Sequence, residues 1–240
     1  MEKRSSASSF WARMRNPEDR HPFFDQIEKL FKNKTGLAGL IIITLFAVAA
    51  VFAPVISPHN PIENALYDQL KPPVWDEGGA TKNLLGTDDL GRDILSRLIY
   101  GARVSLTLGV VSVGLALTLG TLLGALAGYY GRWVDNLIMR ITDLFLAFPF
   151  LLLAMMIVAA LGPGLKNSAL ALVISWWPWY TRIARGVAVS LRERYFVEAA
   201  QAVGVSDAVI ILRHILPNTI SPILVQATVD LGTVILAMGG

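Results

Sequence analysis

Long stretches without a charged side chain are the feature that most limits what this chain can fold into. No Asp, Glu, Lys or Arg occurs between Lys34 and Glu63. Within that stretch, the segment from Gly36 to Ile56 is about as long as a helix must be to span a bilayer, roughly 20 residues. Only 16% of the 240 residues are charged, whereas soluble domains have about a quarter. These observations exclude an ordinary water-soluble globule and predict a membrane protein.

Four further uncharged runs follow, and each is predicted to be a membrane-spanning helix. They lie between Arg103 and Arg132, Asp143 and Lys166, Lys166 and Arg182, and Arg213 and Asp230. The segment Asn167 to Thr181 would rise only about 22 Å as a helix, against about 30 Å of hydrocarbon, so we expect it to extend to Arg185. The predicted fold class is therefore an all-α, polytopic membrane protein with five spans.

Lysine and arginine residues in the flanking segments predict the orientation. They are frequent in residues 1–34, which places the N-terminus in the cytoplasm. Residues 35–240 then form a transmembrane domain, with an external loop at about 57–103 and a cytoplasmic loop at about 186–213. The N-terminal segment is a candidate interfacial helix because it carries Phe23, Phe24, Ile27, Leu30 and Phe31. The net charge of +3 is thus a topology signal, and no nucleic-acid partner is expected.

Two motifs inside the spans indicate how helices pack. Gly120, Gly124 and Gly128 recur every four residues, which places them on one helix face where another backbone can approach closely. The aromatic cluster from Trp176 to Tyr180 favours a belt at the membrane interface, and the alternative is the lining of a path for an aromatic substrate.

The second half of the external loop has the pattern of an amphipathic helix. Residues 91–101 place apolar side chains at helical spacing, and Asp93 and Arg97 are predicted to pair on the polar side. Thr87, Asp88 and Asp89 precede this helix. They are predicted to cap it rather than to bind a metal ion, because their spacing matches no calcium loop. No metal site is predicted.

The sequence contains none of the common catalytic motifs. It has no phosphate-binding loop, no H-E-x-x-H, no G-x-S-x-G and no cysteine, so the chain is not expected to be an enzyme. Two carboxylates near the spans, Asp143 and Asp230, are candidates for a translocation path. The alternatives are that Asp143 pairs with Arg140 at the interface and that Asp230 lies in the outer headgroup zone.

The most specific pattern lies in the second cytoplasmic loop. Glu198, Ala199 and Ala200 are followed after three residues by Gly204, and nine residues further by the run His214, Ile215, Leu216 and Pro217. This pattern resembles the EAA loop of the membrane subunits of binding-protein-dependent ABC importers. His214 stands where the family usually has Ile, a departure similar to the dipeptide and oligopeptide branch. The external run from Leu85 to Asp93 also resembles the C-type subunit of those permeases.

Such a loop makes physical sense as a docking element. Ala199 and Ala200 keep one face of a short helix thin enough to enter a groove, and Gly204 can take the left-handed conformation that ends the helix. Ser206 or Asp207 can cap the next helix. The alternative is an ordinary solvated linker between two spans.

The resemblance implies the transmembrane fold of a type I ABC importer and a function as half of the path for dipeptides or oligopeptides in a bacterial inner membrane. It implies coupling to ATPases through Glu198, Ala199, Ala200, Gly204, His214, Leu216 and Pro217. The implied partners are a second homologous permease subunit, two cytoplasmic ATPases that bind ATP and Mg, and an external solute-binding protein. No cofactor is expected in this chain. Family members usually have six spans, so the chain is expected to end one span short.

Other functions fit parts of the same pattern. Permeases of this branch also import nickel, glutathione or oligosaccharides. An ATP-independent channel or secondary transporter, or a membrane assembly protein, would have to explain the EAA pattern in another way.

Overall fold

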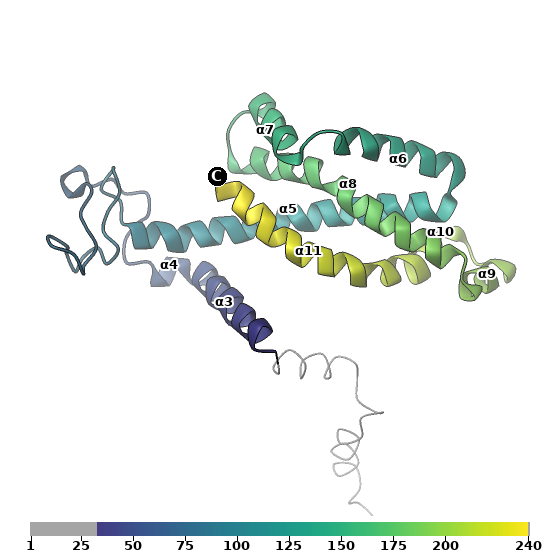
Figure 1. Ribbon diagram of the computed structural model, residues 1–240, viewed down its shortest axis with the longest axis horizontal. Coiled ribbons are helices and arrows are strands. Elements are labelled where there is room, and N and C mark those ends of the chain that lie inside the picture. Colours follow the sequence, from purple (N-terminus) through teal and green to yellow (C-terminus); the bar gives the residue numbers. More distant parts are fainter. Residues whose placement is uncertain (1–32, 240) are drawn as a thin grey trace, which may run out of the picture. The chain divides into compact units, whose positions relative to one another are not determined.

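The computed structural model describes residues 33–239, and the chain divides into two units, residues 1–103 and 104–240. The interfacial helix predicted around Phe23 to Phe31 lies outside the described residues. In the described part the regular elements are helices, apart from one isolated β-bridge between Thr87 and Asp93. The predicted all-α class is therefore confirmed (Figure 1).

The first unit contains the first predicted span as α3, Lys34–Val51. Asn33 caps this helix, because its side-chain oxygen accepts hydrogen bonds from the backbone N–H groups of Thr35 and Gly36. The helix is long and apolar enough to cross a membrane. It ends before the predicted boundary at Ile56 and is followed by the short α4, Ala53–Ile56. Pro54 explains the break, since it has no N–H to continue the hydrogen-bond ladder.

The loop that was predicted to be external has a short 3₁₀ helix, η2, Leu66–Asp68, and a turn built around Asp88. The Asp88 carboxylate accepts hydrogen bonds from the backbone N–H groups of Leu90 and Arg92, each at 2.9 Å, and pairs with the side chains of Arg92 and Arg97. The predicted pair between Asp93 and Arg97 is therefore wrong, because Arg97 reaches Asp88 instead.

The helix cap is also formed by a residue other than those predicted. Asp93, not Thr87, Asp88 or Asp89, caps the next helix, α5, Ile94–Tyr130. Its Oδ2 accepts hydrogen bonds from Ser96 N at 2.8 Å and Ser96 Oγ at 2.7 Å. Burial raises the pKa of Asp93, but the hydrogen bonds from Ser96 and Asn83 outweigh it, so that the pKa lies below its ordinary value. The cap is a buried carboxylate satisfied by the fold.

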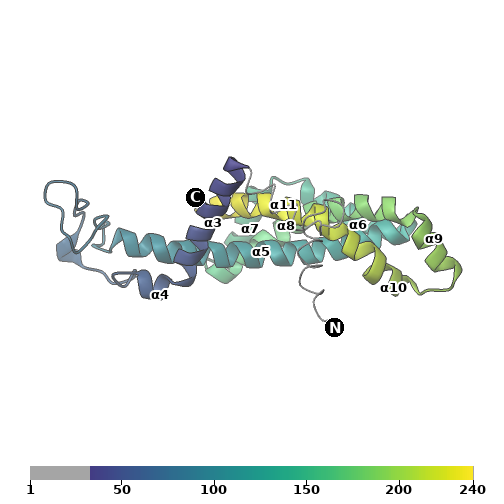
Figure 2. The ribbon, with the colours of Figure 1, turned by 90° about the horizontal axis from the view of Figure 1, so that it is seen from below.

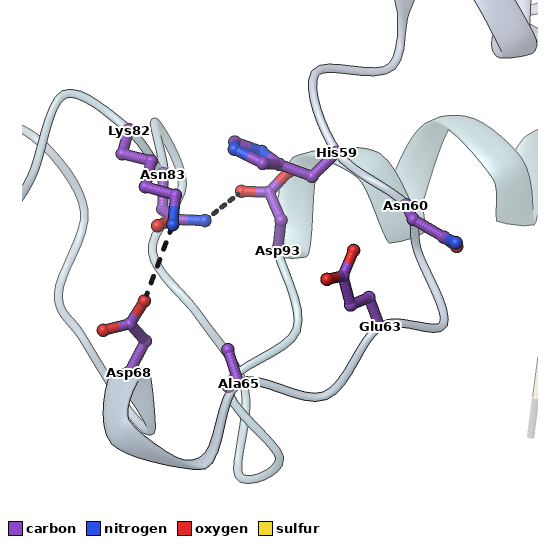
Figure 3. Close-up of a pocket in the computed structure, with 9 residues that line it drawn as sticks. His59, Asn60, Glu63, Ala65, Asp68, Lys82, Asn83 and Asp93 are labelled. Carbon is purple, nitrogen blue, oxygen red and sulfur yellow. Dashed lines mark hydrogen bonds and ion pairs between the residues drawn. The ribbon is translucent and has the colours of Figure 1, made fainter.

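A polar cavity of about 100 Å³ lies beside this cap (Figure 3). On one side, Asn83 Nδ2 donates to Asp93 Oδ1 at 3.0 Å, and His59 Nδ1 lies 3.8 Å from Asp93 Oδ2. On the other side, Lys82 Nζ lies 3.8 Å from Asp68 Oδ2. The polar groups around the cavity thus hold together turns that are distant in the sequence.

Acid should loosen this loop only at low pH. Desolvation opposes ionisation of Asp88, but the N–H groups of Arg92 and Leu90 and the Arg92 guanidinium lower its pKa to about 2. A carboxylate with a depressed pKa stabilises the fold above its unfolded pKa, and that stabilisation is lost as the pH falls through the folded pKa. Pepsin cleavage within residues 57–93, corrected with an unfolded substrate, should stay constant down to about pH 4 and rise as the pH approaches about 2. Cleavage that rises already at pH 5 would contradict this assignment.

The second predicted span lies within α5, Ile94–Tyr130, a single helix of 37 residues. The prediction of a separate surface helix over residues 91–101 is therefore wrong. The residues that follow Asp93 continue into the span without a break. No proline interrupts the helix, and a lone glycine such as Gly101 does not end it. At 1.5 Å per residue, α5 is roughly 55 Å long, well beyond the hydrocarbon thickness.

The third predicted span is not one straight helix. The chain forms α6, Arg132–Leu146, and α7, Phe150–Leu161, which meet at an angle of 86°. Pro149 precedes α7 and restricts the backbone before it. Alone, α7 has 12 residues, too few to span a bilayer.

The remaining helices complete the second unit. They are α8, Leu165–Arg192, α9, Tyr195–Ala202, α10, Asp207–Ile210, the π-helix η3, Ile211–Ile215, and α11, Leu216–Gly239. By length and composition, residues 33–239 contain three candidate spans, or four if α6 and α7 count as one. The prediction of five is thus supported only in its coarser form. The helix α8 is long enough, but charged residues such as Lys166 and Arg182 interrupt its apolar surface.

The predicted glycine packing is confirmed by the contact between α5 and α8. A Cβ atom on Gly120 would lie 2.5 Å from the carbonyl oxygen of Trp177, and one on Gly124 would lie 2.4 Å from that of Thr181. Helix α8 also contacts α6, α7 and α11, so it is the central helix of the bundle (Figures 1 and 2).

The aromatic belt predicted for the cluster around Trp177 is wrong for most of its members. Trp176, Trp177 and Tyr180 are buried in the helix core, and only Trp179 is exposed. The rings of Phe150 and Phe145 pack edge-on against Trp176 and Trp177. The three buried aromatic residues of α8 are therefore part of the core between the helices.

Candidate functional site

The predicted EAA segment forms α9, a helix of about two turns that lies with α10 at one end of the bundle (Figures 1 and 2). Its inner side packs through Val197, which is fully buried near Ala188 and Ile210. Glu198 and Ala199 are exposed, and Ala200 is half-buried. The helix therefore has one face held by the protein and another that is free and shallow.

Gly204 ends α9 as predicted. Its φ is +81°, in the left-handed region. The N–H of Gly204 donates to the carbonyl of Gln201 at 3.0 Å, and the N–H of Val205 donates to that of Ala200, also at 3.0 Å. These two hydrogen bonds form a Schellman motif, for which glycine is the favoured residue. The chain thereby turns sharply from α9 into α10.

The cap predicted for the next helix is not formed by a side chain. Ser206 occupies the N-cap position of α10 with extended backbone but makes no capping hydrogen bond. The carboxylate of Asp207 instead accepts a hydrogen bond of 2.6 Å from the hydroxyl of Tyr129 at the end of α5. A hydrogen bond to a charged acceptor is stronger than one between neutral groups, which favours the pairing of Asp207 with Tyr129.

The second half of the EAA pattern lies where the π-helix η3 joins α11. Pro217 has no N–H, and its ring would crowd the carbonyl of Arg213 in a regular helix, so a widened turn is favoured here. The half-buried ring of His214 lies 5.9 Å from that of Phe196 on α9. The fold thus brings both halves of the pattern together, with Leu216 half-buried and Pro217 exposed.

The first of the two candidate carboxylates, Asp143, pairs across helices. Its Oδ1 lies 2.7 Å from Nη2 of Arg182 on α8. The alternative of a pair with Arg140 is therefore wrong. Both side chains of the observed pair are about half exposed, and a role of Asp143 in the translocation path stays a prediction.

The second candidate, Asp230, is only 5% exposed and lies in the contact between α8 and α11. Its oxygens accept hydrogen bonds from Trp176 Nε1 at 2.9 Å and from Gln226 Nε2 at 2.8 Å. The carboxylate is enclosed by protein rather than solvated by headgroups. One oxygen is bound by α8 and the other by a side chain of α11 itself. The predicted role of Asp230 in a path therefore has no support from this geometry and stays a prediction.

Comparison with known proteins identifies the class of this bundle. The family described as "Binding-protein-dependent transport system inner membrane component" matches residues 120–238, and "N-terminal TM domain of oligopeptide transport permease C" matches residues 22–73. The chain is 46% identical over 224 residues to a dipeptide transport system permease protein of Alkalihalophilus pseudofirmus, covering 92% of this chain and 72% of that protein. The chain belongs to this permease family.

Two further relatives of the permease are named for different transported molecules. A di/tripeptide transport system permease protein of Pseudomonas aeruginosa is 45% identical over 85% of this chain and 67% of its own length. A glutathione transport system permease protein of Escherichia coli is 38% identical over 98% of this chain and 76% of its own length.

Membership of the family fixes the general role of the permease. It is a multi-pass inner-membrane component of a binding-protein-dependent transporter and is not itself an ATPase. Transport by this family requires a binding protein and ATPase subunits that bind ATP. The resemblance seen in the EAA pattern is therefore confirmed.

Sequence reasoning missed two features of the site on the permease. It did not single out Tyr129, because a tyrosine at the end of an apolar run has no distinctive spacing. It also missed the π-helix, although Pro217 inside an otherwise helical run was a usable signal.

Proposed function

We propose that this permease forms half of the translocation path of an ATP-driven importer of dipeptides or oligopeptides, with the transmembrane fold of a type I ABC importer. The observation that carries the proposal is the 46% identity to a dipeptide permease over 92% of the chain. Glutathione is a second candidate cargo, favoured by the 38% identity to a glutathione permease over 98% of the chain. Both cargoes are small peptides, and the external binding protein selects between them.

The proposed coupling site is the free face of α9 with the turn that follows it. Glu198 offers a carboxylate, while Ala199 and the left-handed Gly204 leave a shallow surface that a groove on an ATPase can enclose. Tyr195 and Val203, which are 90% and 79% exposed, lie at its two ends. Apolar side chains with this much exposure on a short cytoplasmic helix favour a protein partner. Behind this face, the ring of His214 lies beside that of Phe196, and Leu216 packs against the apolar cluster that contains Val197. Pro217 is exposed at the start of α11 and completes the proposed site.

The proposed topology follows the charge distribution. The N-terminus and α9 lie in the cytoplasm, and residues 57–93 face the external binding protein. In this arrangement α8 is a further span whose charged ends lie at the two surfaces. A second homologous permease subunit supplies the other half of the path, and two ATPases bind the two coupling loops.

Deleting Glu198 to Ala200 tests the coupling role. The deletion should abolish uptake, because it removes almost a full turn of α9, while membrane insertion of the chain continues. Uptake of a labelled dipeptide and the amount of permease in the membrane fraction should be measured together. An Ala202→Ser variant changes the same helix with little change in shape and should transport normally. Normal uptake by the deletion variant would disprove the coupling role.

The cargo is tested with the purified complex in liposomes. Binding protein loaded with dialanine should stimulate ATP hydrolysis, and mass spectrometry of the binding protein purified from cells should find peptides. Stimulation by glutathione alone would favour the second candidate. Transport that persists after removal of the ATPases would instead indicate a channel or a secondary transporter.

A further inference from the structure

One residue of α5 connects the parts of the coupling loop. The hydroxyl of Tyr129 donates a hydrogen bond of 2.6 Å to Asp207 Oδ1 and accepts one of 3.2 Å from Gln201 Nε2. Gln201 is in the last turn of α9 and Asp207 in the first turn of α10, so this hydroxyl bridges the two sides of the Gly204 turn. The ring of Tyr129 is only 5% exposed.

The backbone of the same residue contacts the helix before α9. The carbonyl oxygen of Tyr129 accepts a hydrogen bond of 3.3 Å from Nη1 of Arg192, at the end of α8. Gly131 leaves room for this guanidinium, since a Cβ atom there would lie 2.7 Å from Arg192 Nη1. Tyr129 therefore holds the chain on both sides of α9.

The helix α9 needs such support because it cannot hold its own position. A helix of eight residues is marginal in water and depends on tertiary contacts. Its packed face is a small apolar contact around Val197, and apolar attraction is not directional. Hydrogen bonds at both ends are directional and therefore fix the position of the helix more narrowly.

We propose that Tyr129 is a positioning residue that makes the coupling loop move with α5 as one rigid body. This inference rests on the proposed coupling function of α9. A force that an ATPase applies to α9 then reaches a transmembrane helix directly through Gln201 and Asp207, in addition to passing along the chain through α11. Without the hydroxyl, α9 still docks, but its movement is partly lost in rearrangement of the loop.

The test is a Tyr129→Phe variant in the full complex with ATPases and binding protein, reconstituted in liposomes. This change removes the hydroxyl and keeps the ring in the core. The dialanine imported per ATP hydrolysed should fall roughly tenfold, as expected for the loss of a hydrogen bond to a charged group. Tyr130→Phe is the matched control, because Tyr130 is the neighbouring residue on the exposed side of α5 and should keep the parental ratio.

Asp207 provides a second, independent comparison. Asp207→Asn keeps an oxygen that can accept from Tyr129 and should retain most of the ratio. Asp207→Ala should lower the ratio, but less than Tyr129→Phe, which also removes the hydrogen bond from Gln201. Combining the two changes should add little to Tyr129→Phe, which already removes the hydrogen bond to Asp207.

The outcomes separate this proposal from the one on which it rests. An unchanged ratio in Tyr129→Phe overturns the positioning role, as does a loss of uptake that only follows a loss of assembled complex. If the Glu198 to Ala200 deletion imports dialanine normally in the same assay, the coupling function fails and the positioning role fails with it. If the deletion is inactive and Tyr129→Phe is normal, only the positioning role is wrong.

Discussion

Replacing Gly124 by valine should prevent the permease from accumulating as a folded protein. A Cβ atom at this position would lie 2.4 Å from the carbonyl oxygen of Thr181 and 2.6 Å from Cβ of Ala184. Both atoms belong to α8, and the backbone oxygen cannot rotate away as a side chain does. Helices α5 and α8 would have to separate along the whole glycine row. Overpacking a core costs about 1–3 kcal/mol when side chains can adjust, and we expect at least the upper end of this range here.

Gly114→Val is the matched control for this substitution. Gly114 lies in the same helix, and a Cβ atom there would meet nothing within 4 Å. The two variants should be compared by the amount of protein in the membrane fraction and by thermal denaturation in detergent. Gly124→Val should show little folded protein, and Gly114→Val should resemble the parent. Equal stability of the two variants would mean that α5 and α8 do not pack through this row.

Replacing Gly204 by valine should nearly abolish uptake while leaving the permease in the membrane. The obstacle is conformational rather than steric, because a Cβ atom at Gly204 would have open space, while φ is +81°. Left-handed backbone costs an ordinary residue about 1–2 kcal/mol, and a β-branched residue more. The cost is avoided if the turn rearranges, which would change the path from α9 into α10 and displace the proposed coupling face.

Asparagine distinguishes this explanation from loss of a contact with the ATPase. Among non-glycine residues, asparagine tolerates the left-handed region best, so Gly204→Asn should keep substantially more uptake than Gly204→Val, although its side chain is polar and of similar size. Uptake of dialanine per amount of inserted permease is the measurement. If both variants fail equally, the surface at Gly204 must be bare for docking, and the backbone argument is insufficient.

Predictions from local pattern succeeded where one segment decides the outcome. The helical character of the spans, the glycine spacing at Gly120, Gly124 and Gly128, and the left-handed turn at Gly204 all follow from properties of neighbouring residues. Each of these was correct in the structure. The EAA pattern also identified the family correctly, because its spacing is specific.

Predictions failed where a side chain had more than one available partner. Arg97 was expected to pair along its own helix with Asp93 but pairs with Asp88, and Asp143 was expected to pair with Arg140 if it paired locally but reaches Arg182 on α8. Neighbours on one helix are the only partners that the sequence places within reach. Folding brings further charged groups within reach, and each side chain then pairs with the group that is best placed, Asp88 for Arg97 and Arg182 for Asp143.

The sequence alone determined the amount of apolar surface in each segment, and this in turn determined that the chain lies in a membrane and is helical. The EAA pattern from Glu198 to Pro217 is likewise a property of the sequence. Tertiary structure decided which side chains lie inside the bundle, such as Trp176 beside Asp230, and which residue ties α9 to α5. The physical reason is that hydrophobicity and backbone preference act within a few residues. The hydrogen bond between Tyr129 and Asp207 joins residues that are 78 positions apart, and it exists only because the helices between them pack in one arrangement.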